Sequence, residues 1–431
     1  MNIKLRLIVM NFLQFFIWGA WLLTVGAYWF QNKGWSGAQF GAIFSTMGIS
    51  AIFMPALTGI IADKYINAEK LYGIMHILGA ITLACIPMVT NPSAFFWVIL
   101  LNMIFYMPTL SLSITVGYSA LKSAGGDVVK DYPPIRTFGT IGFIAALWTV
   151  SLTHNETSAN QFYIASAVAL LLGIFAFGLP KCPPMLTGGQ NKSFAEKFGL
   201  NAFSLFKSSR FAIFFMFSLL LGAALQLTNA YGDTFLHDFQ NVPAYKNLIA
   251  VKYPAIIMSI SQVSETLFIL AIPFFLRRFG IKYVMLFSML AWVLRFGLFA
   301  FGNPDDGLWM IIASCIVYGM AFDFFNISGS LFVETQAAPE IRGSAQGMFM
   351  MMVNGFGAFF GSIGSGLLID NFFTHNGQKD WHGIWLAFAA YALTIAIIFP
   401  FAFKYKHNLA LAHTIRDAHP PMKGGLDSPL P

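Results

Sequence analysis

Four small sets of polar and aromatic residues recur at helical spacing inside otherwise apolar segments. Residues three or four apart share one face of a helix, so each set would present its side chains together. Amides offer donor and acceptor atoms side by side, aromatic rings offer stacking faces, and a carboxylate or a guanidinium can bind hydroxyl groups. The sets are Gln226 with Asn229, Gln262 with Glu265, Tyr318 with Phe322, and Arg136 with Thr140 and Phe143.

These side chains together suit an uncharged ligand that combines a flat heterocycle with a polyol. A nucleotide fits poorly, because Arg136 is the one residue of the four sets that could bind a phosphate. Any single pair is more often a hydrogen bond between two membrane helices than part of a binding site. The prediction of a site therefore depends on all four faces meeting at one cavity.

Three ionisable residues, Glu265, Asp323 and Arg295, fall near the middle of apolar segments. A charge that faced lipid there would cost several kcal/mol, so these side chains should face the protein interior or a water-filled cavity. The simpler interpretation is a structural ion pair between Arg295 and either acid. Because the acids outnumber the base, one carboxylate is left over, and it could bind and release a proton. Glu265 and Asp323 are therefore candidates for proton coupling or gating.

The composition indicates that the elements carrying these residues cross a membrane. The 431 residues are 57% hydrophobic and 10% charged, with 47 Phe, and the mean hydropathy is +0.68. Apolar stretches of about 20 residues recur, which is the length of a membrane-spanning helix. Twelve crossings are predicted, at 6–30, 40–62, 71–92, 95–121, 137–153, 161–179, 210–235, 252–276, 282–301, 308–334, 343–370 and 382–403. The predicted fold class is an all-α integral membrane protein.

The basic residues indicate the orientation of these crossings. Of the 25 Lys and Arg residues, 20 fall in segments on the side of the N-terminus, four fall in the opposite loops, and Arg295 lies within a crossing. Lys and Arg are retained in cytoplasmic loops, so both termini are expected in the cytoplasm. The net charge of +7 then reflects topology, and no nucleic-acid partner is expected.

The chain divides at a Pro-, Gly- and Ser-rich basic segment. The predicted units are an N-terminal bundle of six helices (1–180), a cytoplasmic linker (181–209), a C-terminal bundle of six helices (210–404) and a disordered tail (405–431). The loop GIIADKYINAEK resembles the cytoplasmic loop of the major facilitator superfamily, through Gly59, Asp63 and Lys64, although Asn67 stands where a glycine is usual. This resemblance implies two bundles that rock about a site near the bilayer midplane.

Long segments resemble the nucleoside:proton symporter family of that superfamily. They include PPIRTFGTIGF (133–143), LGAALQLTNAYGDTFLH (221–237), SISQVSETLFIL (259–270) and VYGMAFDFFNISG (317–329). The resemblance covers essentially the whole chain. It implies that the four sets named first build the substrate site and that Asp323 belongs to the same functional region.

The resemblance also implies a function and its setting. The expected function is proton-coupled import of nucleosides such as uridine and adenosine across the bacterial inner membrane by alternating access. The proton is the coupling ion, neither a cofactor nor a metal is expected, and the expected form is a monomer among membrane lipids. The preferred nucleoside, including xanthosine, is left open.

Other functions remain as alternatives. A proton-coupled sugar carrier would use the acids and tryptophans but has less need of paired amides, and a sensor would bind ligand without accumulating it. A membrane-embedded enzyme is disfavoured, since no nucleophile or metal motif is present. The glycine-rich stretch GFGAFFGSIGSG (355–366) predicts close helix contact, not phosphate binding.

Overall fold

The computed structural model describes residues 2–184, 200–338 and 341–405. Over these residues the protein is helical apart from a short hairpin of two strands, β1 (Thr374–His375) and β2 (Gln378–Lys379). Part of the predicted linker, 185–199, and the predicted disordered tail from residue 406 onward lie outside the described residues.

The N-terminal half contains the first six crossings. Its elements are α1 (Ile3–Gly19), α2 (Val25–Ala27), the π-helix η1 (Tyr28–Asn32), α3 (Gly37–Lys64), α4 (Ala68–Cys85), η2 (Ile86–Met88), α5 (Pro92–Ser123), α6 (Val128–Leu152) and α7 (Asn160–Ala176). The helix α5 begins at an Asn-Pro sequence that favours a helix start. The Asn91 side chain accepts a hydrogen bond from the Ala94 amide (2.8 Å), and Pro92 occupies the first turn, where no N–H is needed for a helical hydrogen bond.

The C-terminal half contains the other six crossings. Its elements are η3 (Leu200–Lys207), α9 (Ser209–Asp238), η4 (Phe239–Asn241), α10 (Ile249–Lys252), α11 (Pro254–Phe301), α12 (Leu308–Gln336), α13 (Arg342–Met350), the π-helix η6 (Met351–Gly357), α14 (Ala358–Phe372), the hairpin and α15 (Trp381–Ala402). The 48-residue α11 is two crossings joined at Gly280, whose φ of 78° and ψ of 167° break the helix. Glycine adopts this conformation without the steric penalty that a side chain would bring.

The twelve predicted crossings are confirmed. Within the described residues, nine helices are long and apolar enough to span a membrane. One of these is the double helix α11, and the 17-residue helices α1 and α7 provide the remaining two crossings. The helices form two bundles of six, as the sequence predicts.

Three details differ from the sequence-based boundaries. The helix α6 begins at Val128, nine residues before the predicted start, and continues through Pro133 and Pro134. The first crossing breaks after Gly19 and resumes through α2 and η1. The eleventh crossing contains η6, a π-helical stretch that hydropathy does not reveal.

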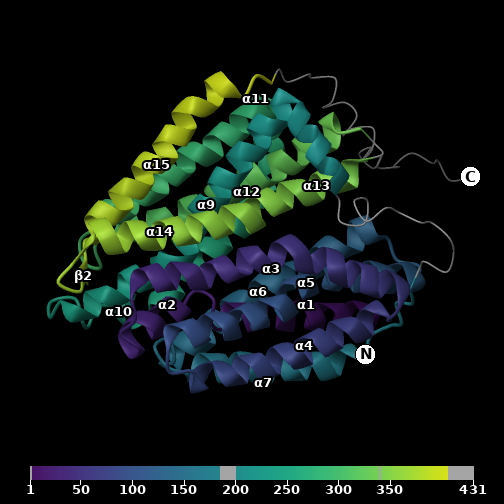
Figure 1. The fold of residues 1–431 in the computed structure, drawn as a ribbon, viewed down its shortest axis with the longest axis horizontal. Helices are drawn as coiled ribbons and strands as arrows, with labels where there is room; N and C mark the ends of the chain where they lie inside the picture. Colours follow the sequence, from purple (N-terminus) through teal and green to yellow (C-terminus); the bar gives the residue numbers. More distant parts are fainter. Residues whose placement is uncertain (1, 185–199, 339–340, 406–431) are drawn as a thin grey trace, which may run out of the picture.

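The two halves lie against each other as two layers (Figure 1). α1 begins at one end of the molecule, hereafter the terminal end, and α2, α10 and the β hairpin lie at the opposite, far end. Helix α3 packs closely on α14 and η6: a Cβ at Gly41 would lie 2.2 Å from the Ser362 carbonyl oxygen of α14, and one at Gly48 would lie 2.5 Å from the Gly355 carbonyl oxygen of η6. The predicted helix contact of the 355–366 stretch is confirmed, and it joins the two halves.

Candidate functional site

A cavity of about 850 Å³ lies between the two halves. Its walls come from α1, α3 and α5–α6 of the N-terminal half and from α9, α11, α12, α13 and η6 of the C-terminal half. All nine residues of the four sets line this cavity: Arg136, Thr140, Phe143, Gln226, Asn229, Gln262, Glu265, Tyr318 and Phe322. The structure therefore brings together the faces that the sequence could only place on separate helices.

One wall of the cavity is an ordered aromatic surface. The rings of Tyr318 and Phe322 are stacked, with centroids 5.8 Å apart and planes 6° apart. The Trp292 ring meets Tyr318 edge-on at 6.0 Å, which fixes the orientation of the tyrosine. Stacked rings of this kind offer flat faces for a planar ligand.

Two amides provide acceptor atoms that the protein itself does not use. Gln226 is 2% exposed, and its Oε1 has no hydrogen-bond partner among the described residues. Oε1 of Gln262 and the indole Nε1 of Trp18, which also lines the cavity, likewise have no hydrogen-bond partner among the described residues. Buried polar atoms without partners are costly. These three atoms are therefore suited to hydrogen bonds with a bound ligand.

Arg136 is held in place by packing. Its guanidinium carbon lies 3.9 Å from the centroid of the Phe15 ring, a cation–π contact. A Cβ at Gly139, one turn along α6, would lie 2.7 Å from Arg136 Nη1 and 2.6 Å from the Phe15 ring. Glycine at this position leaves room for the arginine over the ring and directs a positive charge to the cavity wall.

Glu265 lines the opposite half of the cavity, where α11 and α12 approach most closely. A Cβ at Gly319 of α12 would lie 2.6 Å from the Ser264 backbone and 2.8 Å from the Glu265 nitrogen. The Ser264 hydroxyl donates a hydrogen bond to the Ile316 carbonyl oxygen. These contacts hold the backbone at Ser264 and Glu265 against α12, the helix that carries the aromatic wall.

The alternative of an ion pair for Arg295 is not realised in the described part of the chain. Arg295 is fully buried; its Nε donates to Thr228 Oγ1 (3.2 Å) and its Nη1 donates to the Ser314 carbonyl oxygen (2.6 Å). Its guanidinium carbon also lies 4.7 Å from the Tyr318 ring centroid. Arg295 therefore supports the aromatic wall from behind and neutralises neither acid directly.

Asp323 is buried next to the site without being part of the cavity wall. It is 4% exposed, and its Oδ2 has no hydrogen-bond partner among the described residues. The two acids thus differ: Glu265 lines the cavity, whereas Asp323 is buried and is not among the residues that line it.

The cytoplasmic-loop motif lies at the end of α3. A Cβ at Gly59 would meet no atom within 4 Å, and Lys64 is exposed at the helix end. The side chain of Asp63 lies outside the described residues. This conformation therefore shows no steric requirement for glycine at position 59.

Polar pairs at helical spacing do not identify the whole cavity wall. Phe15, Met47 and Asn354 line the cavity beside Trp18. The first two are apolar residues within apolar crossings, where periodicity does not separate a cavity wall from a helix contact. Asn354 lies in η6, whose π-helical geometry shifts the helical face from that expected for an α-helix.

The chain resembles known proteins over nearly its whole length. The family model described as "Nucleoside H+ symporter" matches residues 1–408. The chain is 54% identical over 409 residues to the xanthosine permease of Escherichia coli strain K12, covering 95% of this chain and 97% of that protein. It is 53% identical over 408 residues to the nucleoside permease NupG of the same strain, covering 94% and 97%. A crystal structure of a mutant of the nucleoside transporter NupG superposes with a TM-score of 0.91 at 52% identity, covering 94% of this chain and 100% of that one.

Proposed function

The chain belongs to the nucleoside H+ symporter family, and from this premise we propose that it imports nucleosides together with protons across the bacterial inner membrane. The observation that supports this most directly is the single cavity lined by paired amides, a stacked aromatic wall, an arginine and a glutamate. The chain is a transporter and not an enzyme.

In this proposal the base of the nucleoside stacks on the Tyr318 and Phe322 rings. The unpartnered oxygens of Gln226 and Gln262 accept hydrogen bonds from the ligand, and Glu265 and Arg136 bind the sugar hydroxyls. Phe143, Thr140 and Asn229 complete the enclosure from the neighbouring helices. Uridine and adenosine are the proposed substrates, and xanthosine competes with them for the same site.

Glu265 is the proposed proton carrier, because it is the acid that lines the cavity. Asp323 is the second acid of the coupling region. Arg295 would affect gating indirectly, by holding Tyr318 through its cation–π contact. Proton binding at Glu265 then changes the charge that the ligand meets, which gives the two states of the transporter different affinities.

Residues 1–180 and 210–404 are proposed to rock as two bodies joined by the linker 181–209, in a monomer with both termini in the cytoplasm. The cavity reaches toward the terminal end, since its walls include Pro55 near the end of α3 and Ser344 near the start of α13. With this orientation, the structure is the cytoplasm-facing state.

The test is uptake of radiolabelled uridine into proteoliposomes, with and without an inward proton gradient. Accumulation that needs the gradient and is competed by adenosine and xanthosine supports the proposal. Competition by a disaccharide alone would indicate a sugar carrier, and binding without accumulation would indicate a sensor. Gln226→Ala should lose uptake while Gln378→Ala, a glutamine exposed on the β hairpin, should retain it.

A further inference from the structure

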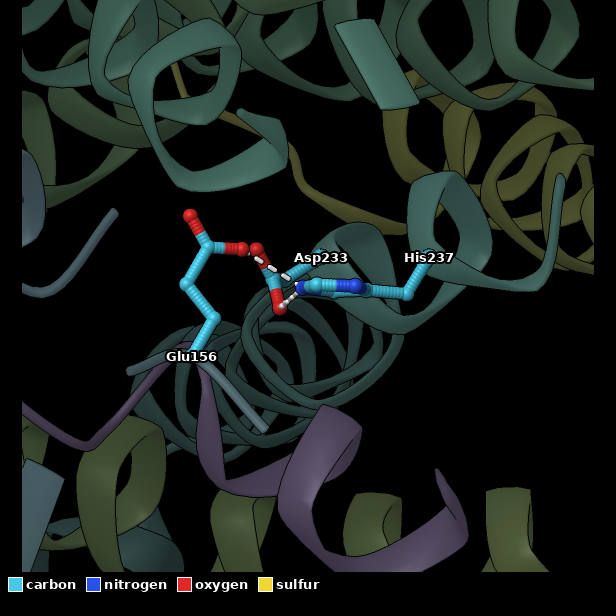
Figure 2. Close-up of side chains that lie close together, drawn as sticks. All are labelled: Glu156, Asp233 and His237. Carbon is cyan, nitrogen blue, oxygen red and sulfur yellow. Dashed lines mark ion pairs between the residues drawn. The ribbon is translucent and has the colours of Figure 1, made fainter. Parts of the chain in front are cut away.

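Three ionisable side chains lie together (Figure 2), and none of them lines the cavity. They are at the far end, where α9 ends and α10 follows (Figure 1). Glu156 comes from the connection between α6 and α7 in the N-terminal half, whereas Asp233 and His237 lie one turn apart on α9 in the C-terminal half. His237 Nε2 is 2.6 Å from Glu156 Oε2 and 3.4 Å from Asp233 Oδ2. The cluster therefore joins the two halves at the end opposite to the opening of the cavity.

All three side chains are removed from solvent. Glu156 is 4% exposed, Asp233 is 1% exposed and His237 is 2% exposed. Both carboxylates point to the same ring nitrogen (Figure 2). In their ordinary forms at neutral pH, two carboxylates and a neutral imidazole would place two negative charges in one buried space. Such charges are retained in a protein interior only when they are paired or neutralised.

The surrounding groups do not supply the missing positive charge. Asp238, next to His237, is itself acidic, and Lys379 (3.7 Å) and the Trp381 indole (2.9 Å) are bound to it. On the α6–α7 connection, the His154 ring stacks on Tyr253. Among the described residues, neither lysine nor arginine forms an ion pair with the cluster.

Two neutral side chains beside the cluster, Gln161 and Gln240, do not supply the positive charge either. Gln161 of α7 donates an amide hydrogen to the Glu156 carbonyl oxygen (2.8 Å), and the Gln240 amide nitrogen lies 3.3 Å from His237 Nδ1. Lys252 of α10 is exposed, and it forms no ion pair with the cluster among the described residues.

We propose that Glu156, Asp233 and His237 form a proton-binding latch that closes the far end. When the halves come together, the cluster takes up a proton from the water on that side, so that the imidazole and the two carboxyl groups can share hydrogens. When the halves separate, water solvates the acids again and the proton returns to the same side. The latch therefore sets how readily the far end closes and does not change the number of protons transported.

Two hydrogen bonds also join the halves at this end, and one of them is accepted by the Asp370 carboxylate. The Trp148 indole donates to the Ser259 hydroxyl (3.0 Å), and the Gly37 amide donates to Asp370 Oδ1 (2.9 Å) across the halves. A Cβ at Gly26 would lie 2.1 Å from Thr234 Oγ1, so the α2 backbone packs against the Thr234 side chain of α9, next to Asp233. The proposal rests on the proposed function only in taking the far end as the periplasmic one.

The experiment measures closure of the far end against pH. Nitroxide labels at Gln31→Cys and Lys246→Cys, both exposed positions on opposite halves, would report the distance by double electron–electron resonance in a Cys85→Ser background. If one proton is taken up on closing, the closed-to-open ratio should fall about tenfold for each unit of rising pH over the titration range. A ratio that does not change between pH 5 and pH 9 in the otherwise native chain would overturn the proposal.

Variants separate the latch from other titrating groups. Glu156→Gln and Asp233→Asn imitate protonated carboxyl groups, so each should keep the far end closed at high pH and flatten the profile. Glu334→Gln is the matched control, because this acid pairs with Arg342 (3.0 Å) and is exposed at the terminal end; its profile should match the parent. A parental pH profile in the Glu156→Gln, Asp233→Asn double variant would refute the assignment.

Two further outcomes have defined meanings. Closure that is insensitive to pH but is induced by zinc in a Glu156-dependent way would show a metal site and overturn the proton latch. Uridine uptake measured on the same samples separates this proposal from the transport proposal. Loss of the pH profile in the variants without any uridine transport by the parent would support the latch and refute the substrate, and the reverse pattern would do the opposite.

Discussion

Removing the titratable group of Glu265 while keeping its shape should uncouple transport from the proton gradient. Glu265→Gln retains hydrogen-bonding capacity at the cavity wall, where Gly319 and Ser264 fix the backbone. The variant should therefore still bind uridine and exchange it across the membrane. It should not concentrate uridine, because it no longer has a carboxylate in the cavity to carry the proton.

The size of the effect follows from the number of acids near the cavity. One coupled proton across a gradient of one pH unit provides about 1.4 kcal/mol, which is about a tenfold accumulation ratio. Glu265 is the acid that lines the cavity, so the parent should reach about tenfold under this gradient and Glu265→Gln about onefold. If Asp323 also carried a proton, the parent would instead approach about a hundredfold.

The assay is the steady-state ratio of internal to external uridine in proteoliposomes, beside uridine exchange without a gradient. Glu334→Gln should behave as the parent, since that acid is exposed and does not line the cavity. A Glu265→Gln protein that still accumulates uridine tenfold would refute the role of Glu265 in coupling. Loss of exchange as well as accumulation would show that the carboxylate is needed for binding itself.

Three further changes test the site and the fold. Phe143→Ala and Gln226→Ala should weaken uridine binding in purified protein more than they lower its melting temperature, and parental affinity would remove both residues from the site. Gly280→Ala should destabilise the protein by about 1 kcal/mol, because φ is positive there, whereas Gly59→Ala in open space on α3 should be neutral or stabilising in thermal unfolding. Gly319→Val should abolish uptake by forcing α12 away from the Glu265 backbone, and unchanged uptake would show that this close approach is not required.

Hydropathy and helical spacing were sufficient to predict the crossings and the cavity faces. Apolar length determines which segments can span a membrane, and it does so before any tertiary contact forms. Spacing of three or four residues then put Gln226 beside Asn229 and Gln262 beside Glu265 on single helix faces. The prediction that these faces meet came from the family resemblance, because periodicity within one helix contains no information about its neighbours.

The features that were missed depend on contacts between distant segments or on irregular backbone. Glu156 lies in a connection between helices, where the sequence has no helical periodicity that could place its side chain. Its partner His237 is 81 residues later in the sequence. The spacing of Asp233 and His237 was a signal, since residues four apart meet on a helix. Without Glu156 it indicates no more than a local pair. The ion pair considered for Arg295 is not seen; instead its Nε and Nη1 donate to a hydroxyl oxygen of α9 and a backbone oxygen of α12.

The contacts between the halves explain how one end can open while the other stays closed. Along α3 and α14 the halves meet through glycines, so backbone lies against backbone and few side chains must interlock. The two halves can therefore rotate relative to each other about this contact without losing large buried side-chain contacts. The contacts that must break to open the far end are directional: the Trp148–Ser259 and Gly37–Asp370 hydrogen bonds and the buried Glu156–His237 pair. The first joins two uncharged groups and the second is accepted by the Asp370 carboxylate, so Glu156→Gln measures how much of the pH dependence of opening comes from the third.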